Sequence, residues 1–113
     1  MTTEIGVTFD CAQPKAMATF WVQTLGYVEE GSDDEYVAII DPERRRPRIL
    51  FQRVPEPKAV KNRVHLDLHV ADMKVEVERL LELGGKRLRM GEDDDGDVWT
   101  VMADPEGNEF CVA

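Results

Sequence analysis

The sequence has 113 residues, with 14 Lys+Arg against 23 Asp+Glu, a formal net charge of -9 and 42% hydrophobic residues. This size and composition are typical of one soluble globular domain and argue against two stacked domains. No apolar run approaches the roughly 20 residues that a membrane span needs, and the N-terminal MTTEIG has neither a basic nor an apolar leader segment, so we expect a cytoplasmic protein without a membrane partner. The acidic balance disfavours nucleic acid as a partner. Two cysteines outside any CxxC pair argue against a disulfide scaffold or a zinc finger.

The first half of the chain predicts one strand, one helix and three further strands. Residues 5–12 alternate apolar and polar side chains, which is the period of a half-buried strand. Pro14 then opens a helix with apolar residues at helical spacing, and Gly26 ends it. Three short strands follow, at about 27–31, 35–40 and 48–54.

The second half repeats this order after a proline-marked linker at about 55–62. Residues 63–70 alternate as a strand, Asp72 is placed to cap a helix, and glycines at 84 and 85 end that helix. Strands at about 86–90, 97–103 and 108–112 complete the second half.

The repeated order predicts an α+β fold of two βαβββ modules, about 4–54 and 63–113, within one domain that spans residues 1–113. Each half-sheet has one apolar face for its helix and one mixed face. We expect the two mixed faces to form a curved mixed sheet around a shared cleft, which is where a small molecule would bind.

Two short motifs accompany this order. Phe20-Trp21 is followed by Leu25-Gly26-Tyr27, and the last turn reads Asp104-Pro105-Glu106-Gly107-Asn108. With these motifs the chain resembles the vicinal oxygen chelate superfamily, which includes glyoxalases, bleomycin resistance proteins and extradiol dioxygenases, and it is most similar to small glyoxalase-like proteins of the actinomycete type. The resemblance implies a paired βαβββ fold, a homodimer, and a pocket that in many members holds a divalent metal ion.

The resemblance also locates metal-ligand positions in the first and last strands of each half. In the second half it places His65 at a ligand position, with Cys111 at the last position and Glu109 two residues earlier on the same strand face. In the first half the equivalent positions hold Gly6, which has no side chain, and Gln52, a poor ligand. The resemblance thus implies one divalent metal ion bound by His65 and Glu109, at a site that is incomplete at Gly6 and Cys111.

The mixed face of residues 63–70 carries three ionisable groups, His65, Asp67 and His69. They form a satisfied polar network, bind a substrate, or perform acid and base chemistry. For catalysis we select His65, because imidazole exchanges protons near neutral pH, together with Glu109 as a neighbouring carboxylate.

Six positions are predicted to bind the substrate, some of them named above. Trp99 either packs in the core or a dimer contact, or stacks against an aromatic ligand, and Cys111 is either a buried apolar residue or a ligand. The predicted substrate-binding residues are Asp10, Gln52, Asp67, His69, Trp99 and Cys111.

Two functions remain open at this point. One is a glyoxalase-like lyase or isomerase that acts on a small oxygenated substrate, with His65 as metal ligand or acid and base. The other is a non-catalytic, metal-free dimer that binds a drug or metabolite, as bleomycin resistance proteins do, and the net charge of -9 would then suit a cationic aromatic ligand. The resemblance indicates the fold and the pocket but not the reaction.

Overall fold

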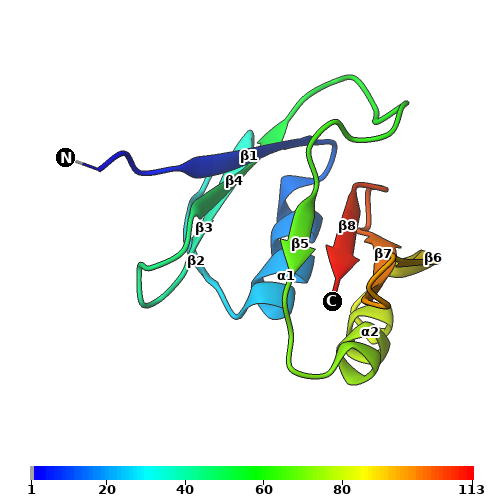
Figure 1. Ribbon diagram of the computed structural model, residues 1–113. Helices are drawn as coiled ribbons and strands as arrows, with labels where there is room; N and C mark the ends of the chain where they lie inside the picture. Colours follow the sequence, from blue (N-terminus) through cyan, green and yellow to red (C-terminus); the bar gives the residue numbers. More distant parts are fainter. Residues whose placement is uncertain (1) are drawn as a thin grey trace. The chain divides into compact units, whose positions relative to one another are not determined.

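The structure, a computed structural model, describes residues 2–113 (Figure 1). The chain divides into two compact units, the first ending at Pro57 and the second running from Lys58 to Ala113. Each unit contains one strand, one helix and three further strands in that order. The predicted α+β class and the repeated βαβββ order are therefore confirmed.

The first unit consists of β1 (Gly6–Cys11), α1 (Pro14–Leu25), β2 (Val28–Ser32), β3 (Tyr36–Ile40) and β4 (Arg48–Arg53). Its four strands form a mixed sheet in the order β1-β4-β3-β2. The first strand pairs in parallel with the last, and the other pairings are antiparallel.

Helix α1 covers one face of this sheet and contacts β3 and β4. Pro14 begins the helix and Gly26 ends it in the left-handed conformation, with φ of 72°. The ring of Trp21 packs 5.5 Å from that of Phe9, which in turn lies 5.4 Å from Phe51. This aromatic cluster forms the core of the first unit.

The second unit consists of β5 (Leu66–Leu68), α2 (Met73–Glu82), β6 (Lys86–Glu92), β7 (Val98–Ala103) and β8 (Glu109–Val112). The sheet order is β5-β8-β7-β6, with β5 parallel to β8 and the other pairings antiparallel. The second sheet therefore repeats the topology of the first.

Helix α2 covers one face of the second sheet and contacts β6, β7 and β8 (Figure 1). The carboxylate of Asp72 accepts a hydrogen bond of 3.2 Å from the Val75 amide, which confirms the predicted cap. Val77 and Leu80 of the helix are buried, as is Phe110 of β8. The opposite face of this sheet has no helix of the unit against it.

Strand β5 is shorter than the predicted 63–70. Val64 belongs to the apolar side of the alternation in 63–70, which the prediction places against the helix, but it is 80% exposed, so the prediction is wrong at this residue. As an edge strand, β5 bonds only to β8, and the ladder covers Leu66–Leu68. Ala113 extends it by two hydrogen bonds, to Leu68 and from Val70.

The two Asp-Pro-Glu turns are built in the same way. Asp41 accepts hydrogen bonds from the amides of Glu43, Arg45 and Arg46, and Asp104 accepts them from two amides of its own turn. Both aspartates are buried. The amide of Glu43, with the other donors, holds the pKa of Asp41 below its ordinary value despite the opposing effect of burial.

Among residues 2–113, neither helix is long and apolar enough to cross a membrane.

Candidate functional site

A row of four side chains crosses the open face of the second sheet. Arg89 of β6 is the register partner of Val101 of β7, and Val101 is the partner of Cys111 of β8. Cys111 is in turn the partner of Asp67 of β5. Register partners share a face of a sheet, so these four side chains form one continuous surface.

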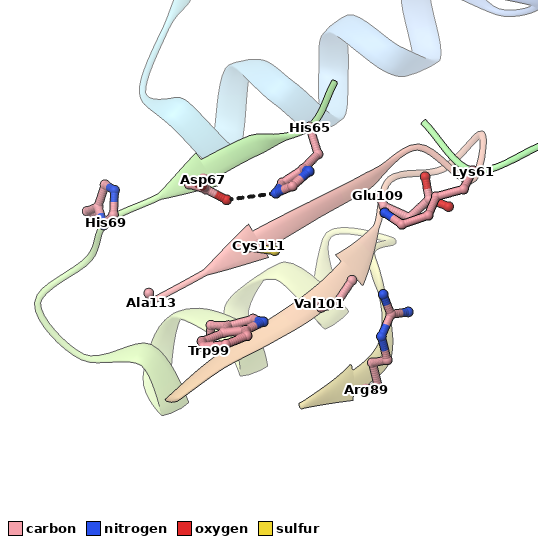
Figure 2. Close-up of a pocket in the computed structure, with 10 residues that line it drawn as sticks. All are labelled: Lys61, His65, Asp67, His69, Arg89, Trp99, Val101, Glu109, Cys111 and Ala113. Carbon is pink, nitrogen blue, oxygen red and sulfur yellow. Dashed lines mark ion pairs between the residues drawn. The ribbon is translucent and has the colours of Figure 1, made fainter. Parts of the chain in front are cut away.

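This surface is the floor of a pocket of about 380 Å³ (Figure 2). The pocket contains six of the predicted site residues, and all of its lining belongs to the second unit. The lining residues are Lys61, His65, Asp67, His69, Arg89, Trp99, Val101, Glu109, Cys111 and Ala113.

Asp10 and Gln52, the other two predicted substrate-binding residues, lie in the first unit. They are register partners on β1 and β4, and both are exposed. The structure thus brings these two residues together with each other and gathers the six second-unit residues in the pocket.

Trp99 forms the apolar wall of the pocket. Its indole lies directly over Gly91, its register partner on β6. A Cβ atom at Gly91 would fall 2.3 Å from Cε2 of that ring, a distance that real side chains do not show. Trp21, by contrast, is buried in the core of the first unit.

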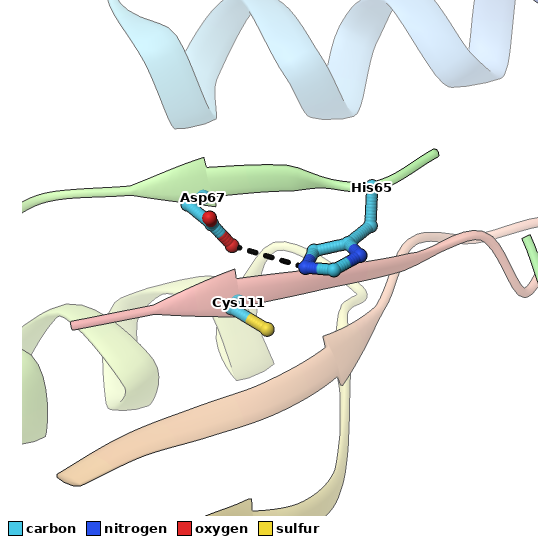
Figure 3. Close-up of side chains that lie close together, drawn as sticks. All are labelled: His65, Asp67 and Cys111. Carbon is cyan, nitrogen blue, oxygen red and sulfur yellow. Dashed lines mark ion pairs between the residues drawn. The ribbon is translucent and has the colours of Figure 1, made fainter. Parts of the chain in front are cut away.

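His65, Asp67 and Cys111 bring three potential ligand atoms together (Figure 3). Nε2 of His65 lies 3.2 Å from Oδ1 of Asp67. One imidazole nitrogen, one carboxylate oxygen and the Cys111 sulfur all lie within 4.8 Å of one another. The side chains of His65 and Asp67 are 42% and 55% exposed, so a small molecule can reach them.

Cys111 is partly exposed rather than fully buried. Partial burial raises the pKa of its thiol, and the carboxylate of Asp67 raises it further. The positive charges of Lys61 and Arg89 act in the opposite direction but do not reverse the shift. The thiol is therefore protonated at neutral pH and is a weak nucleophile as it stands.

Glu109 is engaged by its neighbours. Its carboxylate accepts a hydrogen bond of 3.1 Å from the Asn62 amide and one of 3.2 Å from Lys58. Burial raises the pKa of Glu109, but these hydrogen bonds and the charge of Lys58 outweigh it, so the pKa lies below its ordinary value. Glu109 is ionised, and its charge is balanced by Lys58.

Four residues that line the pocket were not identified from the sequence, namely Lys61, Arg89, Val101 and Ala113, and neither was Gly91, which lies beneath Trp99. Lys61 precedes β5 in an irregular segment, so no periodicity indicates its direction. Arg89 follows a shift of register between Arg87 and Arg89, which interrupts the alternation along β6. Gly91 is recognisable only through its contact with Trp99.

Comparison with known families gives a match over almost the whole chain. A family model described as a glyoxalase-like domain matches residues 6–113. No curated protein sequence matches the chain at a significant level.

Solved structures of this fold are similar to the chain over nearly its full length. One is a glyoxalase/bleomycin resistance protein/dioxygenase family enzyme from Burkholderia phytofirmans PsJN, with a TM-score of 0.78, 17% identity and 97% coverage of both chains. Another is a mutant of the fosfomycin resistance protein FosX from Listeria monocytogenes, complexed with Mn(II) and 1S,2S-dihydroxypropylphosphonic acid, with a TM-score of 0.80, 12% identity and coverage of 99% of this chain and 90% of that one.

A third is the bleomycin-binding protein of Streptomyces verticillus complexed with copper(II)-bleomycin, with a TM-score of 0.66, 20% identity and coverage of 100% of this chain and 98% of that one. At these identities the similarity establishes the fold alone. The named proteins include both a resistance protein with a bound metal ion and a drug-binding protein.

Proposed function

The chain belongs to the glyoxalase-like domain family, and from that premise we propose that its second unit binds a small oxygen-bearing organic molecule and transfers a proton at that molecule, as a lyase or isomerase does. The observation that carries the proposal is the pair of His65 and Asp67, 3.2 Å apart, on the floor of the pocket.

His65 acts as the acid and base. The carboxylate of Asp67 lies 3.2 Å from Nε2 and so favours the tautomer with the proton on that nitrogen, in which Nδ1 carries a lone pair. Nδ1 has no hydrogen-bond partner among residues 2–113. The lone pair takes a proton from a hydroxyl-bearing carbon next to a carbonyl group, the C–H electron pair forms a carbon–carbon double bond, and the carbonyl π pair moves to its oxygen. The proton of the hydroxyl group passes to that oxygen, the carbonyl group re-forms at the carbon that bore the hydroxyl, and the imidazolium returns its proton to the former carbonyl carbon.

A divalent metal ion also fits this site. Imidazole nitrogen, carboxylate oxygen and cysteine sulfur together suit Zn²⁺ better than Mg²⁺ or Ca²⁺. His65, Asp67 and Cys111 would hold it and leave a fourth position for a ligand oxygen, and a bound zinc ion supplies a Lewis acid that polarises that oxygen. We prefer this set to the expected pair of His65 and Glu109, since the Glu109 carboxylate already accepts hydrogen bonds from Lys58 and Asn62.

A metal-free binding protein is the second candidate. The observation in its favour is that His65 and Asp67 contact each other at 3.2 Å without a metal ion. In that case the same pocket holds its ligand without converting it.

Proton transfer can be tested before the substrate is known. A panel of small hydroxyaldehydes and hydroxyketones is incubated with the protein in D₂O, and loss of the carbon-bound proton is followed by ¹H NMR. We expect exchange of at least one compound to be accelerated by about 100-fold or more, and the acceleration to be lost in His65→Ala and Asp67→Asn. Asp94→Asn, in the exposed turn after β6, removes the same charge elsewhere and is the matched control.

Exchange that persists in His65→Ala would refute the acid and base role. If no compound of the panel exchanges, the metal-free binding protein becomes the better description. The two outcomes separate a wrong residue from a wrong class of function.

The metal is tested by elemental analysis of protein purified without chelator and by zinc titration of the melting temperature. If the site holds zinc, the wild type should contain it near-stoichiometrically and lose affinity by about 10-fold or more in Cys111→Ser and His65→Ala, and His65 is then a ligand in place of the acid and base. A protein without metal whose melting temperature zinc does not change would favour the metal-free candidate.

Two further parts of the proposal follow from the family and from the cysteines. We propose that the chain forms a homodimer. A monomer in sedimentation at micromolar concentration would refute this. We also include a cytoplasmic location, since Cys11 and Cys111 form no disulfide; localisation of a tagged chain by microscopy or fractionation tests it.

A further inference from the structure

Each acid of the pocket contacts a basic side chain, but only Glu109 is paired with a permanent cation. Asp67 pairs with His65 at 3.2 Å, and Glu109 pairs with Lys58 at 3.2 Å. Glu109 accepts an additional hydrogen bond from the amide of Asn62. With His65 neutral, Asp67 therefore keeps a negative charge at the His65 side of the pocket, whereas the charge of Glu109 is balanced by Lys58.

Lys61 and Arg89, by contrast, are cations without a counter-ion. Both line the pocket, and neither has an ion-pair partner in the described part of the chain, residues 2–113. Their positive charges both act on the Cys111 thiol at the centre of the floor. Figure 2 shows the guanidinium of Arg89 turned toward the side of the pocket where Lys61 lies.

The next row of the same sheet is apolar and flat. Trp99 lies over Gly91, two residues along β7 from Val101, and Ala113 follows β8 on the same side of the pocket. Two residues along a strand correspond to about 7 Å. A flat ring on the indole of Trp99 would therefore place a substituent one row away, near the guanidinium of Arg89.

We infer that the pocket selects an aromatic carboxylate, with its ring stacked on Trp99 and its carboxylate paired with Arg89 and Lys61. This inference names the ligand class of the pocket in the proposed function and rests on that function for the location of the site. It replaces the cationic aromatic ligand suggested by the net charge of -9. The distribution of charge within the pocket outweighs the net charge, because surface charges more than about 8 Å away are largely screened at physiological ionic strength.

Three probes of one shape test the charge preference. They are 2-naphthoate, the neutral 2-naphthamide and the cationic 2-naphthylmethylammonium, each titrated into the full chain by isothermal calorimetry. We expect the carboxylate to bind at least about 10-fold more tightly than the amide, which is the gain in affinity that a hydrogen bond to a charged group provides. The ammonium should bind least tightly. Added salt should weaken the binding of the carboxylate and leave that of the amide unchanged.

Arg89→Gln should abolish this preference and leave the affinity for the amide unchanged. The matched control is Arg87→Gln, on the same strand, because Arg87 pairs with Glu78 of α2 at 3.3 Å and so lies on the helix side of the sheet. That variant should retain the preference for the carboxylate. Should Arg89→Gln fail to fold, the effect of salt on 2-naphthoate binding to the wild type still tests whether the carboxylate is bound by charge.

The inference is overturned if the amide binds as tightly as the carboxylate, if the ammonium binds best, if none of the probes binds at millimolar concentration, or if Arg87→Gln has the same effect as Arg89→Gln. These are equilibrium measurements and do not depend on proton transfer. A protein that exchanges protons through His65 but shows no charge preference would retain the proposed function and refute the ligand class. Binding with the expected preference but no exchange would do the reverse.

Discussion

Replacing Gly91 by alanine would displace the aromatic wall of the pocket. The added Cβ would lie 2.3 Å from Cε2 and 2.4 Å from Nε1 of Trp99, where ordinary contacts are 3.4–4 Å. The backbone at Gly91 is fixed by its pairing with Trp99 in the ladder of β6 and β7. The indole must therefore move by at least about 1 Å from the strand, into the pocket or into solvent.

The cost of this displacement follows from two opposing effects. Overpacking of this kind costs about 1–3 kcal/mol, and the loss of glycine freedom in the unfolded chain returns about 0.4–1 kcal/mol. We expect a net loss of about 1–2 kcal/mol, which for a chain of this size lowers the melting temperature by roughly 4–8 °C. Binding of 2-naphthoate should weaken by about 10-fold or more, because the stacking surface is lost.

The assay combines melting temperature with the indole N–H signals in the NMR spectrum. The chain has two tryptophans, so the Trp99 signal should shift while that of the buried Trp21 stays in place. Gly31→Ala on β2 is the control, because an added Cβ there meets no atom within 4 Å. The displacement of Trp99 is refuted if Gly91→Ala leaves both indole signals unchanged and has the same melting temperature as Gly31→Ala.

Three further predictions concern the framework. Asp41→Asn should lower the melting temperature at pH 7, and the difference in melting temperature from the wild type should shrink toward pH 3. A carboxylate with a lowered pKa stabilises the fold above its ordinary pKa and loses this effect as the pH falls through the lowered pKa. A difference in melting temperature that is constant with pH would contradict this. Glu109→Gln should speed hydrogen exchange of the Asn62 amide by roughly 5-fold or more, and unchanged exchange would show that the carboxylate does not hold that segment. Phe51→Ala and Phe110→Ala, each in the core of one unit, should each cost about 3–5 kcal/mol in a single thermal transition, and two separate transitions would refute the predicted single domain.

The repeated fold could be predicted because its signals are local. Alternation along 5–12, the proline and glycine at the ends of the first helix and the Asp72 cap each act within a few residues. Strand β5 departed from its prediction because the alternation extends past Leu66–Leu68 at both ends, whereas the length of the paired strand depends on β8. The exposure of Val64 results from this difference.

The candidate site could be predicted only in part. Alternation placed His65, Asp67 and His69 on one face, and the structure gathers them in one pocket. The register shift before Arg89 and the contact of Gly91 with Trp99 depend on pairing between strands, which one sequence does not reveal. The engagement of Glu109 by Lys58 and Asn62 likewise joins segments 47 or more residues apart.

The parallel pairing of β5 with β8 has a consequence for folding kinetics. Leu66 pairs with Phe110, so the ladder closes a loop of 110 − 66 = 44 residues before His65 and Asp67 can meet Cys111. Contacts so distant in sequence form late, since the entropy of loop closure is lost before the ladder is gained. We expect the pocket to be the last part of the second unit to assemble, so a nascent or truncated chain without β8 would retain α2 and the β6–β7 hairpin but have no site.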